Sequence, residues 1–246
     1  MNNYIEFANL YDELMNDFNY EEWANYIEDI FKKYDLSPRD ILEMACGTGN
    51  LTFYLAKRKY NLLCFDLSAD MLAKAYQKLG KSKNVRFLEQ DMVNFNINKK
   101  FDSVISICDS INYIINENDL LSCFKNVYNH LNDKGLFIFD INSFYKLKNI
   151  IGNNTFVEDR DDVFYTWENY YDNENDICEF YLSFFKKEKS NLYSRFDEEH
   201  TEKAYKVEDI LRILKIAGFT NIDYYNAFTF DDVSEDSERI NFVAIK

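Results

Sequence analysis

The sequence is poor in the residues that interrupt regular secondary structure. It has 246 residues, of which only 6 are glycine and 1 is proline. Gly47 and Gly49 nevertheless lie on either side of a single residue. A glycine has no Cβ, so the backbone can pass close to a ligand and adopt conformations that strain other residues. In a chain with so few glycines, this pair is the most conspicuous candidate for a binding loop.

The sequence also lacks the features of several classes of protein. Lysine and arginine number 28 against 43 acidic residues, and the net charge of −15 disfavours nucleic acids and anionic membranes, whose phosphates bind basic side chains. No segment approaches the ~18 consecutive apolar residues of a transmembrane helix. The first residues show neither a basic start nor an apolar core, so we expect no signal peptide and a cytoplasmic location.

Metal sites and disulfides are not expected either. The 5 cysteines are scattered without a C-x-x-C pair, and the 2 histidines, His130 and His200, form no metal-ligand pattern with them. Isolated cysteines in apolar segments behave as small core residues in a reducing compartment. We therefore predict free, packed cysteines and no metal ion.

The glycine pair lies at the junction of a predicted strand and a predicted helix. Ile41–Ala45 is apolar enough for a short buried strand, and Asn50 is a good N-cap for a helix over 51–59. The N–H groups and the positive end of such a helix face one spot, which suits a nucleotide-like ligand. The dinucleotide fingerprint is incomplete, because Thr52 replaces its third glycine. Glu43 inside the strand suits a cationic ligand group, although a chance G-x-G between strand and helix is the simpler alternative.

Several stretches resemble motifs of class I S-adenosylmethionine-dependent methyltransferases. Glu43–Gly49 is similar to the first motif, E/D-x-x-x-G-x-G, and Asp66–Leu72 is similar to the family's D-x-S-x-x-M-L pattern. Asp91 and Met92 match an acid and a following apolar residue of the family, and Phe7–Met15 resembles the N-terminal Y-D-x-L segment of small-molecule members. The resemblance covers nearly the whole chain and points to bacterial small-molecule enzymes such as glycine and amino-sugar N-methyltransferases.

The resemblance implies S-adenosylmethionine as the cofactor and assigns residues to it. Tyr11 would contact the methionine part, Met71 would pack on the adenine, and Asp91 would accept from the adenine amino group. Asp66 ends the second predicted strand, where a carboxylate can accept hydrogen bonds from both ribose hydroxyls. The alternatives are a strand-end acid at Asp66 and ordinary packed side chains at Tyr11 and Met71. The complete set of predicted cofactor residues is Tyr11, Trp23, Glu43, Ala45, Gly47, Gly49, Asp66, Leu67, Met71, Asp91, Met92 and Cys108.

The order of predicted elements defines the expected fold. Strands and helices alternate up to a fifth strand at 135–142, which predicts a doubly wound, Rossmann-like, mostly parallel sheet. The resemblance implies seven strands, with the last antiparallel between its neighbours. Aromatic runs at 163–171, 177–185 and 192–199, separated by polar turns, predict an antiparallel meander.

The chain length fits one α/β domain with an insertion. We expect a methyltransferase core at 1–150 plus 203–246, with a helical cap at 1–35, and a small inserted β lobe at 151–202 over the active site. The lobe carries more Phe, Tyr and Trp than one sheet face needs. Part of its surface would therefore face a ligand or another subunit, which leaves a homodimer open.

Candidate residues for the methyl acceptor follow the fourth predicted strand. Asp109, Asn112 and Tyr113 stand at the carboxyl end of a central strand, where open α/β sheets place their chemistry. The sequence does not identify the catalytic residue. His200, with a pKa that would lie near neutrality, and Tyr11, whose ring could face the sulfonium, are the candidates.

The alternative for His200 is a solvated histidine whose protonated form is favoured by its neighbours Glu198, Glu199 and Glu202. The predicted reaction is methyl transfer to nitrogen or oxygen of a small molecule. A tRNA or protein methyltransferase stays open and would need a basic patch on the lobe. A non-catalytic sensor of the cofactor also stays open. The only basic cluster in the lobe is Lys186, Lys187 and Lys189.

Overall fold

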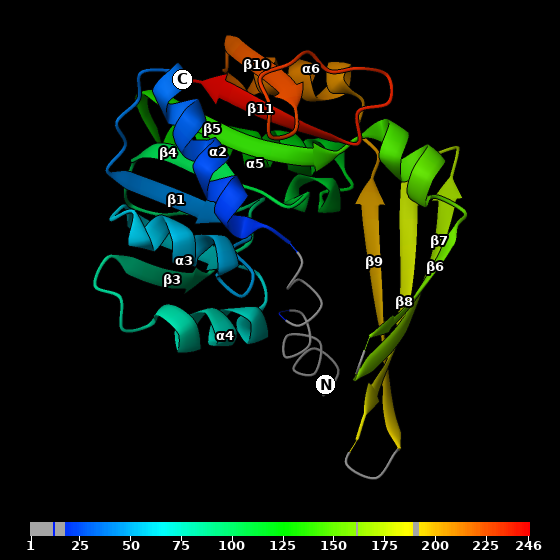
Figure 1. Cartoon of the computed structure of the whole chain (residues 1–246). Helices are drawn as coiled ribbons and strands as arrows, with labels where there is room; N and C mark the ends of the chain where they lie inside the picture. The colour runs from blue at the N-terminus through cyan, green and yellow to red at the C-terminus, as the bar shows by residue number, and fades with distance from the viewer. Residues whose placement is uncertain (1–11, 13–17, 161, 189–191) are drawn as a thin grey trace.

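The computed structural model describes residue 12 and residues 18–160, 162–188 and 192–246. These residues form a seven-stranded sheet covered by helices and a separate four-stranded sheet that projects beside it (Figure 1). The predicted α/β fold, with a mostly parallel sheet and an inserted antiparallel lobe, is confirmed. Tyr11 and most of the predicted N-terminal segment lie outside the described residues.

The large sheet has the strand order of a doubly wound fold. Its strands are β1 (Asp40–Met44), β2 (Asn61–Asp66), β3 (Val85–Glu89), β4 (Phe101–Ser106), β5 (Leu131–Asn142), β10 (Asn221–Asn226) and β11 (Arg239–Ile245). They lie in the order β10-β11-β5-β4-β1-β2-β3. All pairs from β3 to β5 are parallel, whereas β11 runs antiparallel to both β5 and β10. This is the arrangement that the resemblance implied for the last strand.

Helices cover both faces of this sheet. They are α2 (Tyr20–Lys33), α3 (Asn50–Lys57), α4 (Ala69–Leu79), α5 (Glu117–His130) and α6 (Val207–Ala217), with a 3₁₀ helix η1 (Ser110–Tyr113) and a π-helical turn η2 (Lys146–Ile151). Ile41 and Leu42, adjacent in β1, belong to two separate apolar cores because successive strand residues point to opposite faces. The Leu42 core includes Phe124 of α5, and the Ile41 core includes Trp23 of α2.

The lobe contains one strand more than the sequence predicts. Its strands are β6 (Thr155–Arg160), β7 (Val163–Asp172), β8 (Ile177–Lys187) and β9 (Tyr193–Lys203), paired in that order. β6 is an edge strand that pairs with β7, and only Phe156 and Arg160 in it are partly buried. A strand without a buried face has no apolar alternation, so periodicity does not reveal it.

The lobe stands beside the carboxyl ends of β1, β4 and β5 (Figure 1). At its base, Leu147 and Ile151 of η2 pack against lobe residues that include Tyr171. Farther along the lobe, a cluster of Val163, Phe184 and Phe196 packs against Met71 of α4. The lobe therefore contacts the core at both ends of the sheet's carboxyl edge.

Candidate active site

The glycine loop joins β1 to α3 through backbone conformations that favour glycine. The φ angle is +54° at Gly47 and +78° at Gly49. A Cβ on Gly49 would lie 3.2 Å from the Cβ of Ala75, so a larger residue would press on α4. A Cβ on Gly47 would meet no atom of the described residues within 4 Å. The loop is thus packed against the protein at Gly49 and open at Gly47.

The helix after the loop begins one residue earlier than predicted. Gly49 is the N-cap of α3 and Asn50 is its first residue, so the predicted capping role of Asn50 is wrong. The left-handed conformation of Gly49 starts the helix without a side-chain cap. The Asn50 side chain instead donates to Asp12 Oδ1 at 3.1 Å and accepts from Lys78 Nζ at 2.6 Å.

Asp12 binds this loop through its side chain. Its carboxylate accepts a hydrogen bond from Thr48 Oγ1 at 2.7 Å and forms an ion pair with Lys78 at 2.7 Å. Burial alone would raise the pKa of Asp12, but the hydrogen bonds from Lys78 and Thr48 outweigh it and lower the pKa. Asp12 itself is therefore anchored on the glycine loop, whereas Tyr11 lies outside the described residues.

Asp66 lies at the end of β2, as predicted, but its carboxylate already has partners. Oδ2 accepts from the Gly47 N–H at 2.8 Å and Oδ1 accepts from the Ser68 N–H at 2.9 Å. Ser68 caps α4 by accepting from the Met71 N–H at 3.3 Å. Burial raises the pKa of Asp66, against the lowering effect of the backbone hydrogen bonds. Each carboxylate oxygen has a second lone pair, so Asp66 can hold the loop and still accept from a ligand.

Glu43 lies beneath the loop and is 3% exposed. Its Oε2 accepts from Thr52 Oγ1 at 2.7 Å and from the Cys64 thiol at 3.5 Å. Burial raises the pKa of Glu43 to about 7. Thr52, which replaces the third glycine of a dinucleotide fingerprint, is therefore the hydrogen-bond donor to Glu43. Glu43 is thus bonded to the protein through one carboxyl oxygen, and its contact with a cationic ligand group stays a prediction.

Two further predicted cofactor residues have unusual backbone conformations at the carboxyl edge of the sheet. Ala45 follows β1 with a φ of 50°, and Cys108 follows β4 with a φ of 61°. Positive φ is uncommon for residues with a Cβ and is often found at functional sites. Because β1 and β4 are neighbours in the sheet, Ala45 and Cys108 both lie at the carboxyl edge of this strand pair.

The remaining predicted cofactor residues are spread along the same edge and its surroundings. Leu67 is 70% exposed, and Asp91 accepts from the Val93 N–H at 2.9 Å. Met92 is partly buried against the core beneath α5. Trp23 is 1% exposed and packs on Phe228, with ring centroids 4.6 Å apart. The Trp23 side chain thus lies within the packing of α2 against the connection between β10 and β11.

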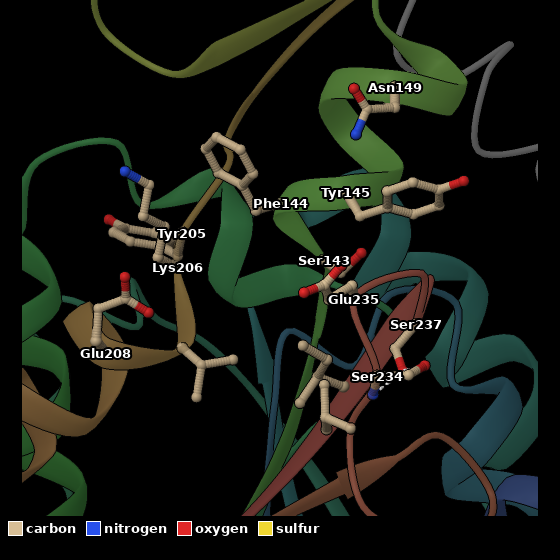
Figure 2. A pocket seen from close by; sticks show the side chains of 13 residues that line it. Ser143, Phe144, Tyr145, Asn149, Tyr205, Lys206, Glu208, Ser234, Glu235 and Ser237 are labelled. Atoms are coloured by element: carbon tan, nitrogen blue, oxygen red, sulfur yellow. Dashed lines mark hydrogen bonds between the residues drawn. The ribbon is translucent and has the colours of Figure 1, made fainter.

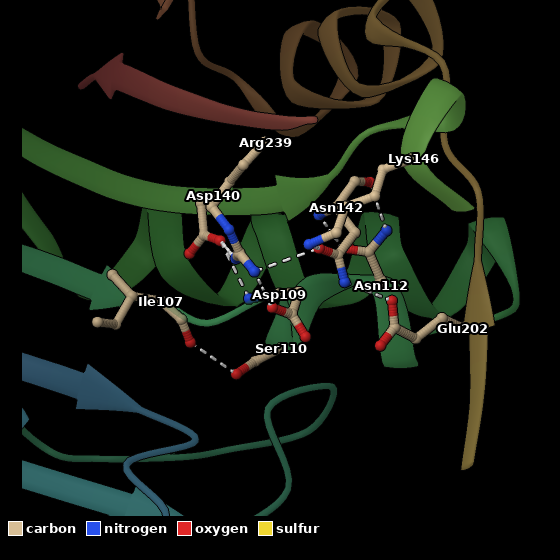
Figure 3. A network of polar contacts seen from close by, with 9 residues as sticks. All are labelled: Ile107, Asp109, Ser110, Asn112, Asp140, Asn142, Lys146, Glu202 and Arg239. Carbon is tan, nitrogen blue, oxygen red and sulfur yellow. Dashed lines mark hydrogen bonds and ion pairs between the residues drawn. The ribbon is translucent and has the colours of Figure 1, made fainter. Parts of the chain in front are cut away.

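An ionic network that the sequence analysis missed holds Asp109 (Figure 3). Arg239, the first residue of β11, forms ion pairs with Asp109 at 2.7 Å and with Asp140 of β5. The Asp109 N–H donates to Asp140 Oδ2 at 3.1 Å. Burial raises the pKa of Asp140 to about 6 even though Arg239 opposes this shift. The available signal was an aspartate inside the apolar run of β5, since a buried acid needs a partner.

Asn112 joins the core to the lobe. Its Nδ2 donates to the carbonyl oxygens of Asn142 at 3.1 Å and Lys203 at 2.9 Å, while its Oδ1 accepts from the Asn142 N–H at 3.0 Å. Glu202 of β9 accepts from Asn142 Nδ2 at 2.9 Å, and burial raises the pKa of Glu202 to about 8. Lys146 also donates to the Asn142 side chain. The amide of Asn112, predicted on the acceptor side, is thus engaged by the protein itself.

Tyr113 and His200 meet where the lobe crosses the core. Their ring centroids are 5.9 Å apart in an edge-to-face arrangement, and Tyr113 is 44% exposed. Burial lowers the pKa of His200. The expectation that neighbouring glutamates favour protonated His200 is therefore wrong. Glu199 points to the opposite face of the strand, and desolvation of the imidazole outweighs the acidic surroundings.

A separate cavity of about 290 Å³ lies near the end of β5 (Figure 2). Its lining includes Ser143, Phe144, Tyr145, Lys206 and Glu235, from the chain around η2, the start of α6 and the connection to β11. The predicted site residues come from other segments. We therefore do not assign this cavity to the active site.

Within the described residues, no group of three or more His, Cys, Asp or Glu side chains is placed to hold a metal ion. All five cysteines are free. No helix in that part of the chain is long and apolar enough to cross a membrane.

Comparisons with known proteins agree with this fold and loop. Residues 41–135 match the family model described as a methyltransferase domain. The chain is 34% identical over 244 residues to the proposed methyltransferase YqeM of Bacillus subtilis (strain 168), covering 99% of this chain and 97% of that protein. A crystal structure of an S-adenosylmethionine-dependent methyltransferase from Clostridium acetobutylicum ATCC 824 is 43% identical, with a TM-score of 0.89 and 98% of both chains covered. A more distant relative is a dTDP-3-amino-3,4,6-trideoxy-alpha-D-glucopyranose N,N-dimethyltransferase of Streptomyces venezuelae, 26% identical over 136 residues, 54% of this chain and 56% of that protein.

The chain therefore belongs to the class I S-adenosylmethionine-dependent methyltransferases. The family identification made from the motifs is confirmed, and so are an enzymatic function and S-adenosylmethionine as the cofactor. The structure adds how the loop, the strand ends and the lobe are placed relative to one another.

Proposed function

We propose that this methyltransferase acts on a nitrogen or oxygen atom of a small molecule held between the core sheet and the lobe. The observation that carries the proposal is the course of β9. Glu202 bonds to Asn142 at the end of β5, His200 contacts Tyr113 after β4, and the cluster containing Phe196 packs on Met71 after β2. The inner face of β9 thus follows the carboxyl edge, where open α/β sheets bind their ligands.

The same edge supplies the proposed cofactor residues. Gly47 gives an open approach to the loop, Asp66 would accept from the ribose hydroxyls, and Asp91 would accept from the adenine amino group. Ala45 and Cys108 would place backbone atoms near the methionine part. The other proposed cofactor contacts are Tyr11, Leu67, Met71 and Met92. Trp23 would support the cofactor site by packing α2 against the core.

S-adenosylmethionine supplies an electrophilic methyl group on a positively charged sulfur. The task of the protein is to hold the nucleophile in line with that group, because positioning alone can contribute roughly 7–11 kcal/mol to lowering the barrier. Packing of the lobe against Met71 and Tyr113 would exclude water from the reaction. A base is needed only for an acceptor that arrives protonated. His200, on the inner face of β9, is the candidate for this base.

Charge supports a small molecule over a nucleic acid. Glu198 lies on the inner face of β9, where a carboxylate would repel a phosphate backbone. The described basic pair Lys186 and Lys187 lies near the far end of β8. The name of the relative from Streptomyces venezuelae states a dTDP-linked amino sugar, which is a small molecule.

The test is methyl transfer from radiolabelled S-adenosylmethionine to a panel of amines, amino sugars and alcohols, with bulk tRNA and a protein lysate as comparison acceptors. We expect label in at least one small molecule and none in the macromolecules. Label in tRNA or protein alone would refute the proposal. Calorimetric binding of the cofactor without transfer to any acceptor would favour a sensor instead.

A further inference from the structure

One acidic side chain on the inner face of β9 has a buried oxygen atom without a hydrogen-bond partner. Glu198 is 5% exposed, and its Oε1 has no hydrogen-bond partner in the described part of the chain. Neither Glu198 nor Glu202 forms an ion pair with any described residue. A buried carboxylate without a partner costs stability, so its presence indicates a ligand that completes it.

The register of the lobe places Glu198 in a row with two other titratable groups. Glu198, His200 and Glu202 alternate along β9 and therefore share one face. Glu198 lies opposite Leu182 of β8, and Leu182 packs against the cluster that contacts Met71. Glu199, between Glu198 and His200 in the sequence, lies on the other face of β9 and is exposed.

The contacts of β9 also fix which part of the core Glu198 faces. Glu202 is level with β5, His200 with the segment after β4, and Phe196 with α4 after β2. Four residues of strand, from Glu202 to Glu198, span about 13 Å, which lies between two strand spacings of about 10 Å and three of about 14 Å. Counted from β5 in the order β5-β4-β1-β2, Glu198 is therefore level with the ends of β1 and β2, which carry the glycine loop and Asp66.

Resting on the proposed function, we propose that the methyl acceptor is an amine and that Glu198 binds its ammonium form beside the glycine loop. An ammonium group offers only donors and a positive charge, which matches a buried carboxylate. A hydroxyl group would give one hydrogen bond and leave the charge unbalanced. The nearby cations Lys146 and Arg239 already have partners in Asn142, Asp109 and Asp140.

The bound ammonium gives one proton to neutral His200, and the freed nitrogen lone pair attacks the methyl carbon. The N–C bond forms while the C–S bond breaks, and the bonding pair stays on sulfur. The products are the methylated ammonium and S-adenosylhomocysteine, and the proton on His200 passes to water when the products leave.

Two cofactor analogues test the placement of Glu198 without knowledge of the natural acceptor. Sinefungin carries an amine-bearing carbon in place of the methyl-bearing sulfur, so it puts an ammonium at the reaction position, whereas S-adenosylhomocysteine has no such group. Both are titrated calorimetrically into the full-length wild type, Glu198→Gln and Glu199→Gln. Glu198→Gln should weaken sinefungin binding about 10-fold, the value of one charge-assisted hydrogen bond, and leave S-adenosylhomocysteine within about 2-fold. Glu199→Gln, one residue along on the exposed face, should change neither.

The outcomes separate this inference from the proposed function. Equal affinities of Glu198→Gln and wild type for sinefungin would overturn it, and so would equal losses for both analogues. Label only on alcohols in the acceptor panel would also overturn it while the proposed function stands. Wild type that binds neither analogue would reject both. A thermal melting temperature of Glu198→Gln equal to or above that of wild type is expected, because a merely structural glutamate would lower it on replacement.

Discussion

The backbone N–H of Gly47 donates a hydrogen bond of 2.8 Å to the Oδ2 atom of Asp66. The acid at the end of β2 thus fixes the conformation of the glycine loop at the end of β1. A second bond, from the Ser68 N–H to Oδ1, fixes the start of α4. One carboxylate therefore sets the geometry of two segments that we assign to the cofactor.

Replacing Asp66 should affect cofactor binding far more than replacing Asp70. Asp66→Ala removes the proposed ribose acceptor and leaves two backbone donors without their partner, so we expect at least a 10-fold loss of affinity for S-adenosylhomocysteine, on the order of 1.5–3 kcal/mol. Asp70 lies in the first turn of α4, where the interaction of its charge with the helix dipole is worth about 0.5 kcal/mol. Calorimetry of both variants checks this. Equal losses would reject the assignment of Asp66 to the ribose.

Breaking the Asp12–Lys78 ion pair should also weaken cofactor binding. Asp12→Asn loses the charge that holds Thr48 and Lys78 at the glycine loop, so we expect roughly a 3- to 10-fold loss of affinity. Asp29→Asn is the matched control, because Asp29 and Lys32 form an equally short ion pair on the exposed surface of α2. An equal effect of both substitutions on calorimetric affinity would contradict the anchoring role.

Glu43 should make stability depend on pH. The folded protein keeps the Glu43 proton up to a pKa of about 7, while the unfolded chain releases it near 4.5. The unfolded state therefore binds fewer protons between these values, and the free energy of unfolding falls as pH rises from 4.5 to 7. The loss persists above pH 7 and amounts to roughly 3 kcal/mol.

Glu43→Gln removes this titration and keeps an acceptor for Thr52. Relative to the wild type, the variant should be similar in stability at pH 4.5 and more stable at pH 8. Urea denaturation at the two pH values measures the difference. A constant difference between the two proteins would show that Glu43 does not titrate in this range.

Arg239 should matter for stability more than any surface arginine. Arg239→Met leaves Asp109 and Asp140 without their cation, and Asp140 is 0% exposed, so we expect a loss of about 3–5 kcal/mol in unfolding free energy. Arg212→Met is the control, because Arg212 pairs with Glu117 and Asp209 on the surface, where a pair is worth about 0–1 kcal/mol. Similar losses in urea denaturation would contradict the network.

Local sequence features determined the framework of this protein. The alternation of strands and helices along the chain predicted the doubly wound sheet. The spacing of apolar residues identifies each element and its buried face. Gly47 and Gly49 were identified because the loop conformation needs glycine. Asp66 was placed at its strand end for the same local reason.

Interactions between distant segments were decided only by the tertiary structure. Arg239 meets Asp109 across 130 residues of sequence, and no periodicity connects them. β6 was missed because an exposed edge strand has no buried pattern. The alternative of a solvated, protonated His200 did not hold, because sequence shows nearby acids but not the burial that lowers the pKa of the imidazole. The alternation of Glu198, His200 and Glu202 is in the sequence, yet only the packing of the lobe turns that face toward the core sheet, where desolvation shifts the pKa values of all three side chains.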